Sequence, residues 1–159
     1  QYLYEETKNS PSNFCIGGAG YPEKHFEAMN LKSDLKHLKE KVDAGMEFIV
    51  TQLFYDNKKF FEFEKKCREI GITVPIIPGL KPITNLRHLT FIPKFFNTNF
   101  PEEFSNELEK CKTNYEVKKV GIEWSTIQSK ELVKAGVPVL HFYTMGKGES
   151  VKNIASKIF

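Results

Sequence analysis

The strongest constraint on the fold is a fourfold alternation of short, mainly apolar runs with amphipathic helical segments. Three of the helices between the runs are predicted to end at Gly45, Gly71 and Gly136. Runs of this kind are typical of parallel strands that are covered on both faces. The pattern therefore predicts an α/β fold with a parallel sheet. The predicted strands are Phe14–Tyr21, Phe48–Asp56, Val74–Leu80 and Val137–Tyr143.

Two architectures fit this alternation. One is a small doubly wound sheet, and the other is half of a (β/α)8 barrel, which needs about 250 residues in full. We favour the half barrel because unusual residues follow each strand, and four such loops on one rim match the top face of a barrel better than a single crevice. The loops are Tyr21–His25, Gln52–Asp56, Leu80–Asn85 and Tyr143–Lys147.

Composition indicates an ordinary globular protein of 159 residues, 40% apolar and 27% charged. The net charge of +3 comes from interleaved acids and bases, which predicts a solvated surface and no nucleic-acid partner. The apolar runs are too short to span a bilayer and no leader pattern opens the chain, so a cytoplasmic protein is expected. Cys15, Cys67 and Cys111 are widely spaced, which predicts reduced core thiols and neither disulfides nor a metal site.

The remaining segments give less regular predictions. Residues 1–13 are expected to hold the end of a helix and a polar linker. Pro75 and Pro78 are expected near the ends of their strand. Thr84 or Asn85 is expected to cap a short helix that runs to about Ile92. Residues 93–113 are predicted to be helical in pieces, and residues 151–159 to form a last helix.

Several residues are candidates for a site. Gln52 is an amide at the end of a buried strand, where side chains of parallel sheets meet ligands. The glycines of the first strand indicate either a ligand close to the backbone or packing beside a bulky neighbouring helix. Asp34, His37 and Lys41 form a stripe on one helix, which by itself indicates a solvated face.

Five motifs together resemble the methylenetetrahydrofolate reductase family, in its order and at its spacing over essentially the whole chain. They are Gly20–His25, Lys41–Gly45, Thr51–Asp56, Ile76–Pro82 and His141–Met145. The resemblance implies that residues 1–159 form about the last four βα units of a catalytic TIM barrel. It also implies FAD-dependent reduction of 5,10-methylenetetrahydrofolate to 5-methyltetrahydrofolate by NADH or NADPH, which feeds methionine synthesis. The family's general-acid glutamate would lie upstream of Gln1.

The resemblance also implies roles for single residues. Lys41 suits a pyrophosphate and Asp34 suits ribose or adenine donors, while Gln52 has the donor and acceptor needed for both pterin and nicotinamide. His88 stands where some members have a glutamine, although a helical histidine is otherwise expected at the surface. Lys147 stands in place of an arginine and would meet the glutamate tail of folate without a bidentate fork. The implied FAD contacts are Tyr21, His25, Ala28, Asp34, His37 and Lys41, and the implied substrate contacts are Gln52, His88, Tyr143 and Lys147.

Other readings of the chain remain open. A doubly wound binding domain without catalysis explains the length, and a different barrel enzyme could grip phosphate with Gly146–Gly148. Half a barrel leaves edge strands exposed to pairing, and the family commonly forms oligomers, so a homo-oligomer is expected. The expected partners are NADH or NADPH and methylenetetrahydrofolate, with no membrane.

Overall fold

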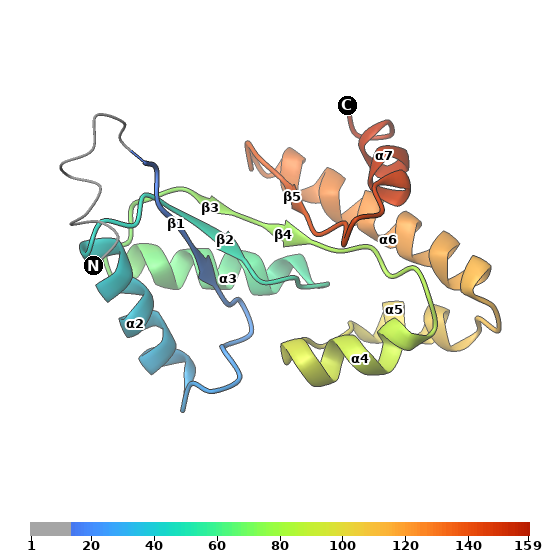
Figure 1. Cartoon of the computed structure of the whole chain (residues 1–159), viewed down its shortest axis with the longest axis horizontal. Coiled ribbons are helices and arrows are strands. Elements are labelled where there is room, and N and C mark those ends of the chain that lie inside the picture. The colour runs from blue at the N-terminus through green and yellow to red at the C-terminus, as the bar shows by residue number, and fades with distance from the viewer. Residues whose placement is uncertain (1–13) are drawn as a thin grey trace.

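The computed structural model describes residues 14–159 as parallel strands flanked by helices (Figure 1). The predicted helix end and linker of residues 1–13 lie outside the described residues. The elements are β1 (Gly17–Gly20), α2 (Leu31–Asp43), β2 (Phe48–Thr51), α3 (Asn57–Glu69), β3 (Ile76–Ile77), β4 (Gly79–Leu80), α4 (Arg87–Phe96), α5 (Glu102–Glu109), α6 (Asn114–Lys134), β5 (His141–Phe142) and α7 (Glu149–Ala155).

All strand pairs within residues 14–159 are parallel, which confirms the predicted α/β class. The strand orders are β1-β2-β3 and β4-β5, so spatial neighbours follow the order of the chain without a reversal. The third predicted strand is wrong in one respect, because Pro78 divides it into β3 and β4. Proline has no N–H for a ladder, and its carbonyl accepts from the His141 N–H at 3.0 Å, so the chain leaves β2 for β5 at this residue.

Local signals set the helix ends as predicted. Gly45, Gly71 and Gly136 have φ of 110°, 80° and 92°, the left-handed conformation that glycine adopts without strain. The start of α4 differs from the prediction, because Leu86 is its cap residue and makes no side-chain cap bond. Asn85 still accepts the His88 N–H through its Oδ1 at 3.2 Å. The helix also continues through Pro93 to Phe96, beyond the predicted end.

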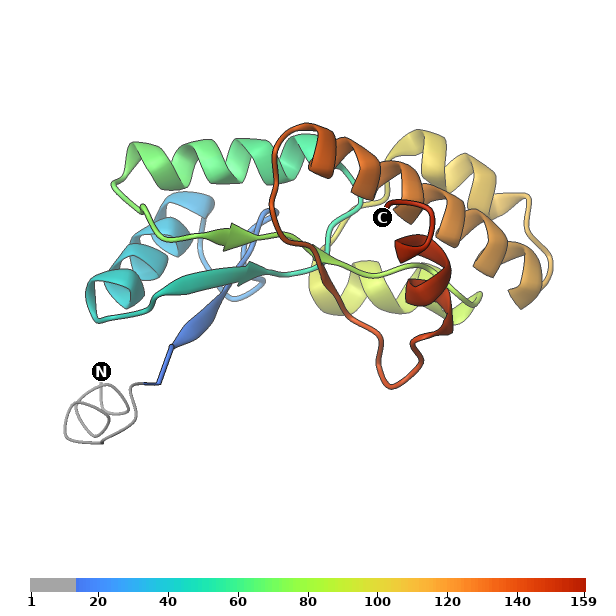
Figure 2. The same cartoon turned by 90° about the horizontal axis from the view of Figure 1, so that it is seen from above.

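The helices gather in two groups around two apolar clusters (Figures 1 and 2). α2 and α3 lie beside β1–β3, and their cluster is centred on Ile49, Phe60 and Phe63. α4, α5 and α6 meet at the other end of the molecule, where Phe104 and Val117 join the second cluster. The carboxyl ends of β2 and β4 point toward this second group, so the loops after these strands lie between the two clusters.

The glycines of β1 make room for neighbouring side chains. A Cβ at Gly17 would lie 2.2 Å from the Phe48 ring, and one at Gly20 would lie 2.7 Å from Ile49 and 2.9 Å from Phe63. Both separations are far inside van der Waals contact. Packing against a helix is seen at Gly20, which faces Phe63 of α3, whereas Gly17 faces Phe48 of the neighbouring strand β2.

The thiols are free, as predicted, but only one of them is a core residue. Cys67 is fully buried, and burial raises its pKa to about 12. Cys15 is exposed and Cys111 half-buried, so the prediction of core positions is wrong for these two. Over residues 14–159, no three His, Cys, Asp or Glu side chains cluster as metal ligands. None of the helices in that range is long and apolar enough to cross a membrane.

The close approach of α6 to the loop after β4 gives a test of this packing. A Cβ at Gly121 would lie 2.0 Å from the Ile83 carbonyl oxygen, which is backbone and cannot rotate away. Gly→Ala inside a helix ordinarily stabilises by about 1 kcal/mol. Overpacking reverses the sign here, so Gly121→Ala should lower the free energy of unfolding by about 2 kcal/mol or more.

Urea unfolding followed by circular dichroism measures this change. Gly148→Ala is the matched control, because nothing lies within 4 Å of its Cβ position and its φ is −81°. An unchanged or increased stability of Gly121→Ala would contradict the contact.

Candidate functional site

The loops after β2 and β4 and after β5 open into a cleft of about 1000 Å³. This volume is of the size that small-molecule sites have. Four of the residues that line it are the predicted substrate contacts, which come from separate parts of the chain and meet only in the fold: Gln52, His88, Tyr143 and Lys147.

Gln52 lines this cleft, and two hydrogen bonds fix its position. Its N–H donates to the Gly20 carbonyl at 2.7 Å. Its Oε1 accepts from the Leu53 N–H at 3.0 Å. The amide oxygen has a second lone pair, so both Oε1 and Nε2 of Gln52 can meet a ligand.

Thr51, next to Gln52, links the end of β2 to β4 and to the residue that follows β5. Its Oγ1 accepts from the Gly79 N–H at 2.9 Å, and its carbonyl accepts from the Tyr143 hydroxyl at 2.9 Å. A Cβ at Gly79 would lie 2.1 Å from the Thr51 carbonyl oxygen, which explains the glycine after Pro78. Burial raises the pKa of Tyr143, so its hydroxyl stays protonated and able to donate.

His88 is half-buried on the wall of the cleft, so the expectation of a surface position is wrong. Its Nδ1 accepts from the Thr84 N–H at 3.2 Å, and its Nε2 lies 2.9 Å from the Asn85 side-chain amide. Burial, and then the charge of Lys81, lower the pKa of His88. The bond from the Thr84 N–H to Nδ1 ties the imidazole to the loop before α4.

A set of buried and half-buried side chains that sequence reasoning missed holds the segment after Gln52. Three successive carbonyls of this irregular segment, those of Leu53, Phe54 and Tyr55, each accept a hydrogen bond from a distant side chain. The donors are Thr98 Oγ1 at 3.2 Å, Gln128 Nε2 at 3.0 Å and Trp124 Nε1 at 3.0 Å. Buried carbonyls outside a ladder need such partners. No local pattern marks these donors, which lie 45 to 74 residues away.

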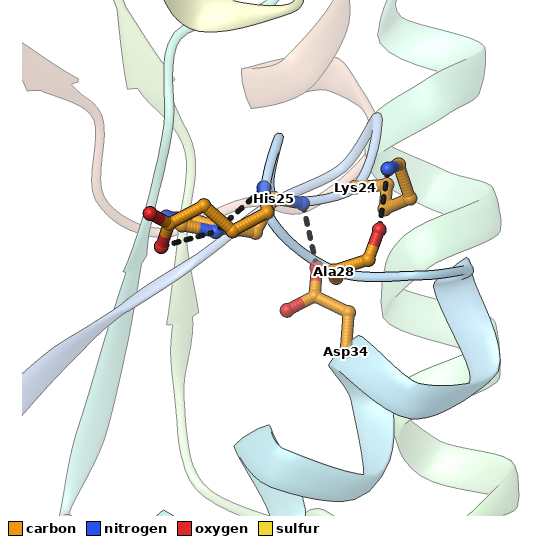
Figure 3. Close-up of polar contacts among 5 residues, drawn as sticks. Lys24, His25, Ala28 and Asp34 are labelled. Carbon is orange, nitrogen blue, oxygen red and sulfur yellow. Dashed lines mark hydrogen bonds and ion pairs between the residues drawn. The ribbon is translucent and has the colours of Figure 1, made fainter.

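The loop after β1 folds back onto α2 (Figure 3). The His25 N–H donates to Asp34 Oδ2 at 2.8 Å, and Lys24 Nζ donates to the Ala28 carbonyl at 2.6 Å. The rings of Tyr21 and His25 pack edge to face with their centres 4.5 Å apart. Four of the predicted flavin contacts are therefore joined in one compact loop-helix unit.

Three of the six predicted flavin contacts lie around one small gap. Tyr21, Asp34 and Lys41 line a gap of about 10 Å³, which has room for about one water molecule. His37 is exposed and does not line this gap. The ammonium, carboxylate and aromatic groups suit a dinucleotide chemically, but the described residues do not enclose one. Their chemistry suits FAD, and they would hold one side of it.

Glu23, in the loop after β1, contacts Asn99, which lies between α4 and α5. Its carboxylate accepts from the Asn99 N–H at 3.3 Å and from Asn99 Nδ2 at 3.1 Å, which ties the loop after β1 to the chain after α4. Burial raises the pKa of Glu23, against the opposing effect of the Asn99 hydrogen bonds. The residue is thus engaged in a structural contact at the rim.

Sequence comparisons agree on one family. The family model "Methylenetetrahydrofolate reductase" matches residues 3–158. A protein of Oryza sativa subsp. japonica, "Probable methylenetetrahydrofolate reductase (NADH)", is 41% identical over 151 residues, which cover 89% of this chain and 25% of that protein. "5,10-methylenetetrahydrofolate reductase" of Salmonella typhimurium is 36% identical over 139 residues, which cover 87% of this chain and 47% of that protein. The chain thus spans about a quarter to a half of these relatives.

A solved structure shares the fold. It is an uncharacterized protein from Clostridium thermocellum that binds two copies of 5-methyl-5,6,7,8-tetrahydrofolic acid. The TM-score is 0.60 at 20% sequence identity, and the match covers 98% of this chain and 56% of that one. The likeness extends over nearly the whole α/β arrangement described above.

The carbonyl contacts after Gln52 can be tested at Thr98. Thr98→Val keeps the shape of the side chain but leaves the buried Leu53 carbonyl without this donor. The free energy of unfolding should fall by about 1–3 kcal/mol. Thr90→Val is the matched control, because the Thr90 hydroxyl donates to a helix carbonyl at the exposed surface and its loss should change stability by less than about 0.5 kcal/mol. Equal urea midpoints for the two variants would contradict the contact.

Proposed function

The chain belongs to the methylenetetrahydrofolate reductase family, and on that premise we propose that it forms part of an FAD-dependent enzyme that reduces 5,10-methylenetetrahydrofolate to 5-methyltetrahydrofolate with NADH or NADPH. The observation that carries this proposal is the meeting of Gln52, His88, Tyr143 and Lys147 around one cleft. Because the chain spans a quarter to a half of the relatives described above, the complete reaction is proposed for the whole protein. From the family we also propose a cytoplasmic homo-oligomer that feeds methionine synthesis.

The proposed architecture is the last four βα units of a (β/α)8 barrel. Sequential order of parallel strands supports it, because each strand of a barrel pairs with the next strand along the chain. A doubly wound sheet needs a reversal of strand order to make its ligand crevice, and residues 14–159 have none. The candidate residues also follow different strands, as on the rim of a barrel.

In this proposal each group of residues has a separate task. Gln52 offers Nε2 and the second lone pair of Oε1 to the pterin or nicotinamide amide. The Tyr143 oxygen can accept a hydrogen bond while its O–H donates to the Thr51 carbonyl. Lys147 faces substrate carboxylates at the mouth of the cleft. Tyr21, Asp34 and Lys41 form the wall for FAD, which when bound supplies the hydride-accepting and hydride-donating group.

Flavin binding is the first test of the proposed function. FAD titrated into the purified chain should show a shifted visible band and quenched fluorescence. Lys41→Met should weaken binding about fivefold, because an exposed ammonium on a pyrophosphate contributes up to about 1 kcal/mol. Lys36→Met, an exposed lysine on the same helix, is the control. Equal FAD affinities of Lys41→Met and the wild type would contradict the role of Lys41.

Folate binding tests the cleft by itself. Gln52→Ala should raise the Kd for 5-methyltetrahydrofolate about threefold to tenfold, since one neutral hydrogen bond contributes roughly 0.5–1.5 kcal/mol. Isothermal titration calorimetry gives the Kd, and FAD affinity of the same variant should stay at the wild-type value. Unchanged folate affinity would exclude Gln52 as a substrate contact.

A further inference from the structure

The cleft contains more basic side chains than Lys147, the one lysine among the predicted substrate contacts. Lysine or arginine side chains line it at four places, and the one acid among the lining residues, Glu149, is 2.8 Å from Lys118 Nζ. The other three cations, Lys81, Arg87 and Lys147, make no ion pair with a carboxylate within residues 14–159. An electropositive cleft of this kind attracts anionic ligands.

Lys81 is the cation of this group with the most restricted surroundings. It follows β4 directly, and its neighbours Leu80 and Pro82 are both buried, so its backbone has little freedom. The side chain is half-buried, and burial lowers its pKa. Such burial disfavours a charge that has no partner. The site therefore holds a partly desolvated cation facing the cleft.

The ammonium of Lys81 also has N–H donors that remain for a ligand. An ammonium has three N–H donors, and within the described residues Lys81 Nζ has one hydrogen-bond partner, the Tyr143 carbonyl at 3.5 Å. This distance is at the long limit for a hydrogen bond. His88 nearby has a lowered pKa and stays neutral, so it offers no second cation there. An anionic oxygen in the cleft would complete the coordination of Lys81.

We propose that Lys81 is an anion-binding residue of this cleft that pairs with a negatively charged oxygen of the bound substrate. The inference rests on the proposed function and adds to it a specificity contact that the predicted set lacks. Two substrates of that reaction offer such oxygens, namely the glutamate carboxylates of the folate and the phosphates of the nicotinamide dinucleotide. A charged hydrogen bond in a partly desolvated place contributes more than the exposed contact of Lys147.

The test compares complete ligands with truncated ones on the full 159-residue chain. Calorimetry gives the Kd of 5-methyltetrahydrofolate and of 5-methyltetrahydropteroate, which lacks the glutamate. It also gives the Kd of NADH and of reduced nicotinamide riboside, which lacks the phosphates. Lys81→Met should weaken at least one complete ligand about tenfold or more and leave its truncated partner unchanged. The ligand pair that shows this difference identifies the anion.

Three variants keep the result interpretable. Lys81→Arg should retain most of the affinity because it keeps the charge. Lys119→Met, an exposed lysine of α6 outside the cleft, should bind like the wild type. Lys81→Gln repeats the measurement with a polar side chain in case the methionine disturbs folding.

Two results would count against the inference in different ways. Equal affinities of Lys81→Met and wild type for every ligand, or equal losses for complete and truncated ligands, would overturn the role of Lys81 while the proposed function stands. A wild-type chain that binds neither folate nor NADH would contradict the proposed function, and the inference with it.

Discussion

The site depends on the hydrogen bonds that converge on Thr51. This buried residue ends β2, accepts from Gly79 through its hydroxyl and from Tyr143 through its carbonyl, and so joins β2 to the strand pair β4-β5. The backbone ladder is interrupted at Pro78, so β1-β2-β3 and β4-β5 form two separate short sheets. The Thr51 bonds connect these two sheets. Because Gln52 follows Thr51 and Lys81 follows β4, the same contacts set the spacing of the groups that face the cleft.

Rigidity beyond the end of β2 comes from side chains and not from regular structure. Thr98, Trp124 and Gln128 donate to three successive carbonyls, so these carbonyls of the segment after Gln52 keep hydrogen-bond partners when the ladder ends. Two of the donors come from α6, and Gly121 allows that helix to approach the loop after β4 closely. If Gln52 binds substrate as proposed, a backbone fixed in this way needs little ordering when the ligand binds.

The two candidate binding regions differ in character. The candidate substrate region is a cleft of about 1000 Å³ in which Lys81, Arg87 and Lys147 make no ion pair within residues 14–159. The candidate flavin region surrounds a gap of about 10 Å³. Glu23 and Asn99 connect the loop of the wall to the rim near α5. If the chain forms part of a barrel, as proposed, the cleft is largely built by its own residues and the flavin wall is the part that gains most from further strands.

The sequence by itself determined the features that depend on local conformation. Helix ends at Gly45, Gly71 and Gly136 need only a positive φ, and the alternation of strands and helices, like the place of Gln52 at a strand end, follows from periodicity. Tertiary structure decided what depends on neighbours far along the chain. It placed His88 in a wall and not at the surface, gave the β1 glycines bulky neighbours, and brought Lys81 to an electropositive cleft. Such contacts join residues that no local pattern relates, so only the folded chain specifies them.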